Sequence, residues 1–108
     1  MGFFDRLRKN RVNLTGGRGE SMEDAIVISA SNHMAGVRAE YEYLSRQYGR
    51  RGVDWEMQSQ ELCDGPESGQ KCDVLTIRLK NGQTQTIYFD ITQFFGKFSI
   101  DDVMRLPE

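Results

Sequence analysis

The longest regular run of apolar positions lies in residues 32–49, where apolar side chains recur every three or four residues. This spacing predicts an α-helix with one apolar stripe. The stripe consists of Met34, Val37, Tyr41, Leu44 and Tyr48. Ser31 or Asn32 can cap the first free amides, and Gly49 can end the helix in a left-handed conformation. Because such a stripe needs a surface to cover it, we expect the helix to pack on a β-sheet.

Shorter apolar patterns elsewhere predict four β-strands. Residues 25–30 are apolar and rich in β-branched side chains, which indicates a strand buried on both faces. Residues 53–63 begin with alternating apolar and polar positions and continue as a polar run, which favours an edge strand or a β-bulge. Residues 72–91 hold two alternating runs on either side of Asn81 and Gly82, the signature of a β-hairpin.

The loop of this hairpin decides which side chains share a face. A two-residue Asn-Gly loop would place Leu75 and Ile87 on opposite faces of the sheet. A three-residue loop with Gly82 left-handed pairs Leu75 with Ile87 and keeps one apolar face, so we predict the three-residue loop. The face away from the helix then carries Val74, Thr76, Arg78, Thr84, Thr86, Tyr88 and Asp90. A mixed face of this kind is typical of sheets that are open to water or to a partner.

Two cysteines flank the loop formed by residues 64–71. Counting alternate positions along uninterrupted strands places Cys63 and Cys72 on opposite faces, and only a bulge would bring them together. We therefore predict free thiols. Two cysteines and one distant histidine, His33, are also too few for a zinc site of the usual spacing.

The first residues differ in charge from the rest of the chain. Five basic residues and one acidic residue give residues 1–18 a charge of +4, so the remainder carries −6 of the chain's net −2. A short helix would place Phe3, Phe4 and Leu7 on one side of a basic amphipathic arm that also includes Arg8. This arm can dock on the domain itself, bind a groove of a partner, or lie in a membrane interface through residues 1–11. Nucleic-acid binding is not indicated, because the acidic remainder opposes it.

The last residues open with an aromatic cluster. Its members are Phe94, Phe95 and Phe98. Ser99 and Asp102 resemble a capping box, which predicts a short helix from Ile100 that Pro107 ends. We expect this segment to close one end of the core, or to form a partner-binding patch if its aromatic side chains are exposed.

These elements predict an α+β fold in two layers, with one main helix on an antiparallel sheet of about four strands in the order β-α-β-β-β-α. A chain of 108 residues has the length of one domain. We assign residues 1–20 to the arm and a Gly-rich linker, and residues 21–108 to the domain. The pattern leaves open which edge of the sheet the first strand occupies, and it leaves the oligomeric state open.

No motif for catalysis, a metal or a cofactor is present in the sequence. His33 lacks a nucleophile at a useful spacing, and Glu40, Glu42 and Asp90 are best explained as solvated carboxylates. No apolar run approaches the roughly 20 residues of a membrane-spanning helix, and the charged start is unlike an export signal. We therefore expect a cytoplasmic protein that is not an enzyme and binds no cofactor.

Three hypotheses of function remain. The first is an accessory or protein–protein interaction module, which contacts another protein through its outer sheet face or its arm. The residues expected at these contacts are Phe3, Phe4, Leu7 and Arg8 in the arm, and Val74, Arg78 and Tyr88 on the sheet. The second is a peripheral membrane protein anchored by residues 1–11. The third is a small thiol-dependent enzyme or ligand binder that uses Cys63 or Cys72.

Overall fold

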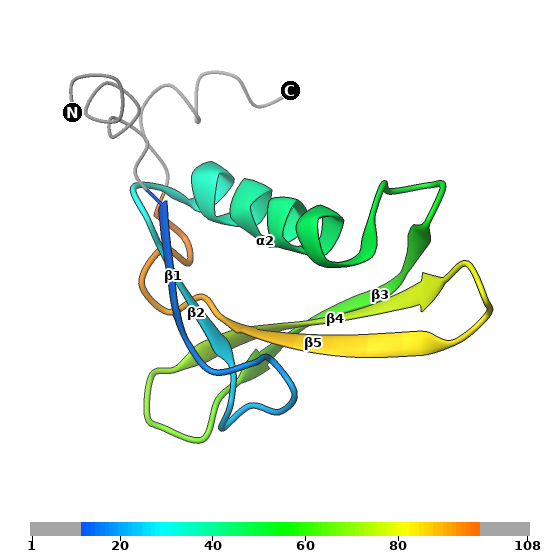
Figure 1. Ribbon diagram of the computed structural model, residues 1–108. Helices are drawn as coiled ribbons and strands as arrows, with labels where there is room; N and C mark the ends of the chain where they lie inside the picture. Colours follow the sequence, from blue (N-terminus) through cyan, green and yellow to red (C-terminus); the bar gives the residue numbers. More distant parts are fainter. Residues whose placement is uncertain (1–11, 98–108) are drawn as a thin grey trace, which may run out of the picture.

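The computed structural model describes residues 12–97, and within them five strands form one sheet under a single long helix (Figure 1). The elements are β1 (Val12–Gly16), β2 (Ile26–Ala30), α2 (His33–Tyr48), β3 (Trp55–Asp64), β4 (Lys71–Leu79) and β5 (Thr84–Asp90). The strand order is β1-β2-β5-β4-β3, and β2 runs parallel to β5 whereas the other neighbours are antiparallel. The predicted α+β class is confirmed, but the sheet is mixed and has five strands instead of four.

Strand β1 is the element that the sequence pattern did not predict. It lies within residues 1–20, which we assigned to an arm and linker, yet it pairs with β2 along its whole length. Its apolar side chains, Val12 and Leu14, alternate with polar ones over only a few residues. This period is too short to stand out next to the basic residues before it. The folded sheet therefore begins earlier than residue 21.

Helix α2 begins and ends where its sequence signals predict. Asn32 is the N-cap, and its Oδ1 accepts a hydrogen bond from the backbone N–H of Ala35 at 2.9 Å. Gly49 follows the last helical residue with φ of 106°, a conformation that side chains with a Cβ rarely adopt. Its N–H donates to the Ser45 carbonyl at 2.9 Å. Both ends of the helix are thus fixed locally.

The buried side of α2 differs from the predicted stripe. Leu44 is fully buried as expected, but Met34 is 48% exposed. Val37, Tyr41 and Tyr48 are partly buried against the core, and the small residues Ala35, Gly36 and Ala39 are buried as well. A Cβ added to Gly36 would lie 2.4 Å from ring atoms of Phe94. The helix therefore approaches the core at positions that a pattern of large apolar residues does not mark.

The β4–β5 hairpin has the predicted register. Leu75 pairs with Ile87, Leu79 donates its N–H to the Gln83 carbonyl at 2.7 Å, and Gly82 has φ of 91°. Leu75, Ile87 and Phe89 consequently join the core beneath the helix. Tyr43, which does not belong to the predicted apolar stripe, packs edge-on against Phe89 with ring centroids 5.6 Å apart.

Strand β3 is an edge strand and carries a bulge, as its polar run indicated. The register with β4 shifts between Met57 and Ser59, so the side chains beyond that point change faces. As a result, Cys63 lies directly opposite Cys72. The prediction that the two cysteines face opposite ways is wrong, because it assumed an unbroken strand.

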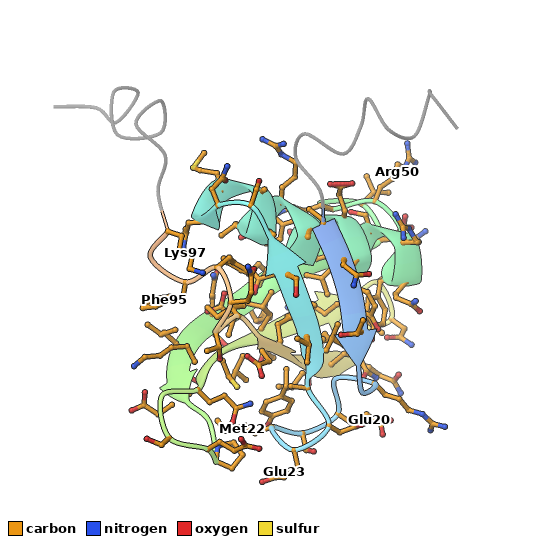
Figure 2. All side chains as sticks on the ribbon, turned by 90° about the vertical axis from the view of Figure 1, so that its left-hand side faces the viewer. Glu20, Met22, Glu23, Arg50, Phe95 and Lys97 are labelled. Atoms are coloured by element: carbon orange, nitrogen blue, oxygen red, sulfur yellow. The ribbon has the colours of Figure 1, made fainter. Side chains whose placement is uncertain are left out.

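The segment after β5 closes one end of the core. Phe94 is fully buried, and Phe95 remains 38% exposed beside Lys97 near the start of α2 (Figure 2). The backbone N–H of His33 donates to the Lys97 carbonyl at 2.6 Å, and the N–H of Gly96 donates to His33 Nδ1 at 3.2 Å. Phe98 and the short helix predicted from residue 100 lie outside the described residues.

Candidate functional site

The outer sheet face is less accessible than its sequence suggested. Val74 is only 8% exposed, and Tyr88 is half-buried. Arg78 is exposed and forms an ion pair with Glu56 on β3 at 3.2 Å. The three residues do share the face, as predicted, since Val74 pairs with Tyr88 and lies an even number of positions from Arg78. Whether this face binds a partner stays a prediction.

The arm residues Phe3, Phe4, Leu7 and Arg8 lie outside the described residues, so their role at a partner or a membrane also stays a prediction. Within residues 12–97, no helix has the length and apolar character needed to cross a membrane. A truncation that tests the arm should begin at Val12, because a later start would remove β1 from the sheet.

A groove lies between β1 and α2 on the helix side of the sheet. Val12 and Leu14 project to this side because they pair with Ala30 and Ile28, which belong to the core beneath the helix. The groove has a volume of about 190 Å³. It is lined by Val12, Leu14, Ala39, Glu42, Tyr43 and Arg46. Four of the lining residues are mainly apolar, while Glu42 and Arg46 supply one charge of each sign.

The outer edge of β1 has backbone groups that no described strand pairs. Gly17 donates its N–H to the Ala25 carbonyl at 3.1 Å, beside β2. On the other side of β2, the N–H of Ala30 donates to Gln93 Oε1 at 2.8 Å, away from β1. Hydrogen-bonded and non-hydrogen-bonded pairs alternate in antiparallel ladders. Val12 and Leu14 therefore direct their N–H and C=O groups outward, away from the sheet.

The opposite edge of the sheet is protected against strand addition. Strand β3 carries Glu56, Glu61 and Asp64 and is interrupted by its bulge. Charged residues and bulges are the usual means by which proteins prevent pairing at an exposed edge. Strand β1 contains no charged residue, and its register with β2 is unbroken. Among the described residues, the β1 edge is therefore the less protected of the two.

Sequence reasoning missed this edge and groove. The alternation of Val12 and Leu14 was the available signal, but the lining residues Ala39 and Tyr43 come from a helix far along the chain. Their proximity follows from the parallel pairing of β2 with β5 and from the helix position, which no local pattern determines.

A second unexpected feature is a buried pair of carboxyl groups. Glu40, which we expected to be solvated, has no exposed surface, and Asp73 on β4 is only 7% exposed. Neither Glu40 oxygen has a hydrogen-bond partner of normal geometry within the described residues. Burial raises the pKa of Glu40 to about 10, and the nearby Asp73 carboxyl adds to the rise. Glu40 is therefore neutral at pH 7.

The described residues contain a pair of thiols but no cluster of metal ligands. Among residues 12–97, no group of three or more His, Cys, Asp or Glu side chains is arranged to hold a metal ion. Cys63 and Cys72 are free thiols that face each other across β3 and β4. They lie at the far side of the sheet from the groove, with β5 and β2 between.

Comparison of the chain with protein-family models, with curated proteins and with solved structures gives no match.

Proposed function

We propose that the protein is a non-enzymatic interaction module whose β1 edge binds an extended segment of a partner protein. One observation carries this proposal: an uncharged strand edge that no other described strand pairs lies directly beside a partly apolar groove. In this binding mode, backbone hydrogen bonds supply affinity and side-chain pockets supply specificity. The partner strand would pair with the outward N–H and C=O groups of Val12 and Leu14.

The size of the groove favours a peptide side chain over a small-molecule ligand. Its volume of about 190 Å³ is below the roughly 300–1,000 Å³ typical of pockets that enclose such ligands. Because side chains alternate along a strand, every second residue of the bound segment would face α2. An apolar residue of the segment suits Ala39 and Tyr43 of the lining, and a charged or polar residue suits Glu42 or Arg46.

A random peptide library displayed on phage provides the probe for this proposal, with the full chain as the bait. We expect enriched peptides to show alternating apolar positions. Leu14→Asp should weaken their binding by at least about tenfold, or about 1.4 kcal/mol, because the new carboxylate lies in the groove. Thr15→Asp is the matched control, since Thr15 pairs with Val27 and faces the other side of the sheet. It adds the same charge to the edge strand but outside the groove, so it should weaken binding clearly less than Leu14→Asp does.

Amide hydrogen exchange tests the strand addition itself. Bound peptide should slow exchange at Val12 and Leu14, whose N–H groups point outward in the free protein. Asn13 and Thr15 already donate towards β2 and should change little. Equal losses of affinity in the two aspartate variants, or peptides that bind without protecting Val12 and Leu14, would contradict the proposal.

A further inference from the structure

The bulge in β3 creates a cross-strand pair of thiols that the sequence did not predict. Cys63 and Cys72 are direct partners in the β3–β4 ladder, so their side chains lie on the same face. Direct partners in antiparallel strands have Cα atoms about 4.5–5.5 Å apart. This separation falls within the range of about 4.4–6.8 Å that a disulfide spans. The backbone therefore already holds the two residues at bonding range.

The two thiols differ in access to solvent. Cys63 is half-buried on the edge strand, whereas Cys72 has no exposed surface. On its other side, Cys72 pairs with Asp90 of β5, whose carboxylate accepts hydrogen bonds from Gln70 and Thr92. Burial raises the pKa of the Cys72 thiol, and negative charge at Asp90 adds to this rise. Cys72 thus stays protonated and shielded, and an oxidant in solution reaches Cys63 first.

We propose that Cys63 and Cys72 form a redox pair, in which a hydroperoxide oxidises Cys63 and Cys72 then closes a disulfide between β3 and β4. In the first step, the Cys63 thiolate attacks hydrogen peroxide, the O–O bond breaks, and Cys63 sulfenic acid and hydroxide form. In the second step, the Cys72 sulfur displaces the sulfenic oxygen. The S–S bond forms, and the oxygen leaves as water with the Cys72 proton.

The surrounding hairpin is arranged so that this bond can close without a change of register. Gly65 donates its N–H to the Gln70 carbonyl at 2.9 Å, and Lys71 Nζ lies 2.6 Å from Asp64 Oδ1. These contacts join the ends of β3 and β4 immediately next to the cysteines. The loop between the two strands is seen in Figure 1. The disulfide would fix the β3–β4 pairing beyond the bulge. It would leave β1 at the opposite edge untouched.

Oxidation of the reduced full chain with hydrogen peroxide, followed by alkylation and mass spectrometry, tests the proposal. The monomer should lose two hydrogens, about 2 Da, and should regain them on treatment with dithiothreitol. Trypsin separates the cysteines into the peptides 52–71 and 72–78, since it cleaves after Lys71. We expect these two peptides to be recovered as one disulfide-linked species.

Two variants establish the order of reaction. Cys72→Ser should stop at the sulfenic acid of Cys63, which dimedone traps, and Cys72→Ala provides the same measurement if the serine is not tolerated. In Cys63→Ser, the remaining thiol of Cys72 should stay unoxidised while the protein is folded and should react once guanidinium unfolds it. Circular dichroism checks that each variant folds. Three results would each overturn the proposal. They are oxidation of folded Cys63→Ser at the wild-type rate, disulfide-linked dimers as the main product, and sulfinic acid on Cys63 beside an alkylated Cys72.

Discussion

Replacement of Glu40 with glutamine should stabilise the protein, and the gain should increase with pH. The pKa of Glu40 is raised from its ordinary value of 4.5 to about 10 in the folded state. At pH values between 4.5 and about 10, the Glu40 carboxyl is protonated in the folded state and ionised in the unfolded state. The free energy of unfolding therefore decreases as the pH rises through this window. Below about pH 4.5 both states are protonated, and the penalty vanishes.

The magnitude follows from the size of the shift. Each pH unit above the unfolded pKa contributes about 1.4 kcal/mol, so keeping Glu40 protonated in the folded state lowers stability by roughly 3 kcal/mol at pH 7. Glutamine has nearly the same shape, carries no proton to lose, and can donate its amide N–H to Asp73. Part of the gain is offset because a buried amide is also desolvated. We expect Glu40→Gln to raise the free energy of unfolding by about 2 kcal/mol at pH 7.

Urea unfolding followed by circular dichroism at pH 4.5, 6, 7 and 8 measures this difference. The curves of the wild type and Glu40→Gln should cross between about pH 5 and 6, where the penalty on Glu40 equals the cost of the buried amide, and they should separate by about 1.4 kcal/mol per pH unit above that. Glu42→Gln is the matched control, because Glu42 lies on the same helix but is exposed. It should leave the pH dependence unchanged. Parallel curves for Glu40→Gln and the wild type, or a less stable Glu40→Gln at pH 8, would refute the assignment of a buried neutral carboxyl.

Three further substitutions test the packing and the turns through the same unfolding measurement. Gly36→Ala should destabilise by about 1–3 kcal/mol despite its better helix propensity, since the added methyl group would collide with the ring of Phe94. Asn32→Ala should lose about 1 kcal/mol, because the Ala35 N–H loses its cap. Gly82→Ala should lose about 1–2 kcal/mol from backbone conformation alone, as φ is 91° and no atom lies within 4 Å of the added Cβ. A neutral result for any of them would contradict the corresponding contact or turn.

The parts of the fold that the sequence predicted are those determined by neighbouring residues. The ends of α2 follow from Asn32 and Gly49, whose side chain or backbone acts within one turn. The hairpin register follows from Gly82 together with the requirement that Leu75 and Ile87 share a face. In each case the local signal and the apolar pattern predict the same structure, and agreement of this kind is what makes a sequence specify one structure.

The missed features depend on contacts between distant segments. The pairing of β1 with β2 and of β2 with β5 is long-range, so the short alternation of Val12 and Leu14 did not show which strand they pair with or that they form a sheet edge. The polar run in β3 suggested a bulge but not its position, and the position determines which way Cys63 faces. A bulge one residue long reverses every side chain beyond it. The candidate sites were therefore less predictable than the fold class.

Glu40 was assigned to the solvent because of its residue type, and this assignment was wrong. It stands one helical turn after Gly36 and one turn before Leu44, both of which are buried, so its position on the helix already pointed to the core. The usual exposure of glutamate argued the other way. Asp73 lies on the same face of β4 as Leu75 and Ile77, beneath the helix. A protonated Glu40 carries no charge, so it can remain buried beside the Asp73 carboxyl. Helical position, read together with the strand opposite, was thus the better guide than charge.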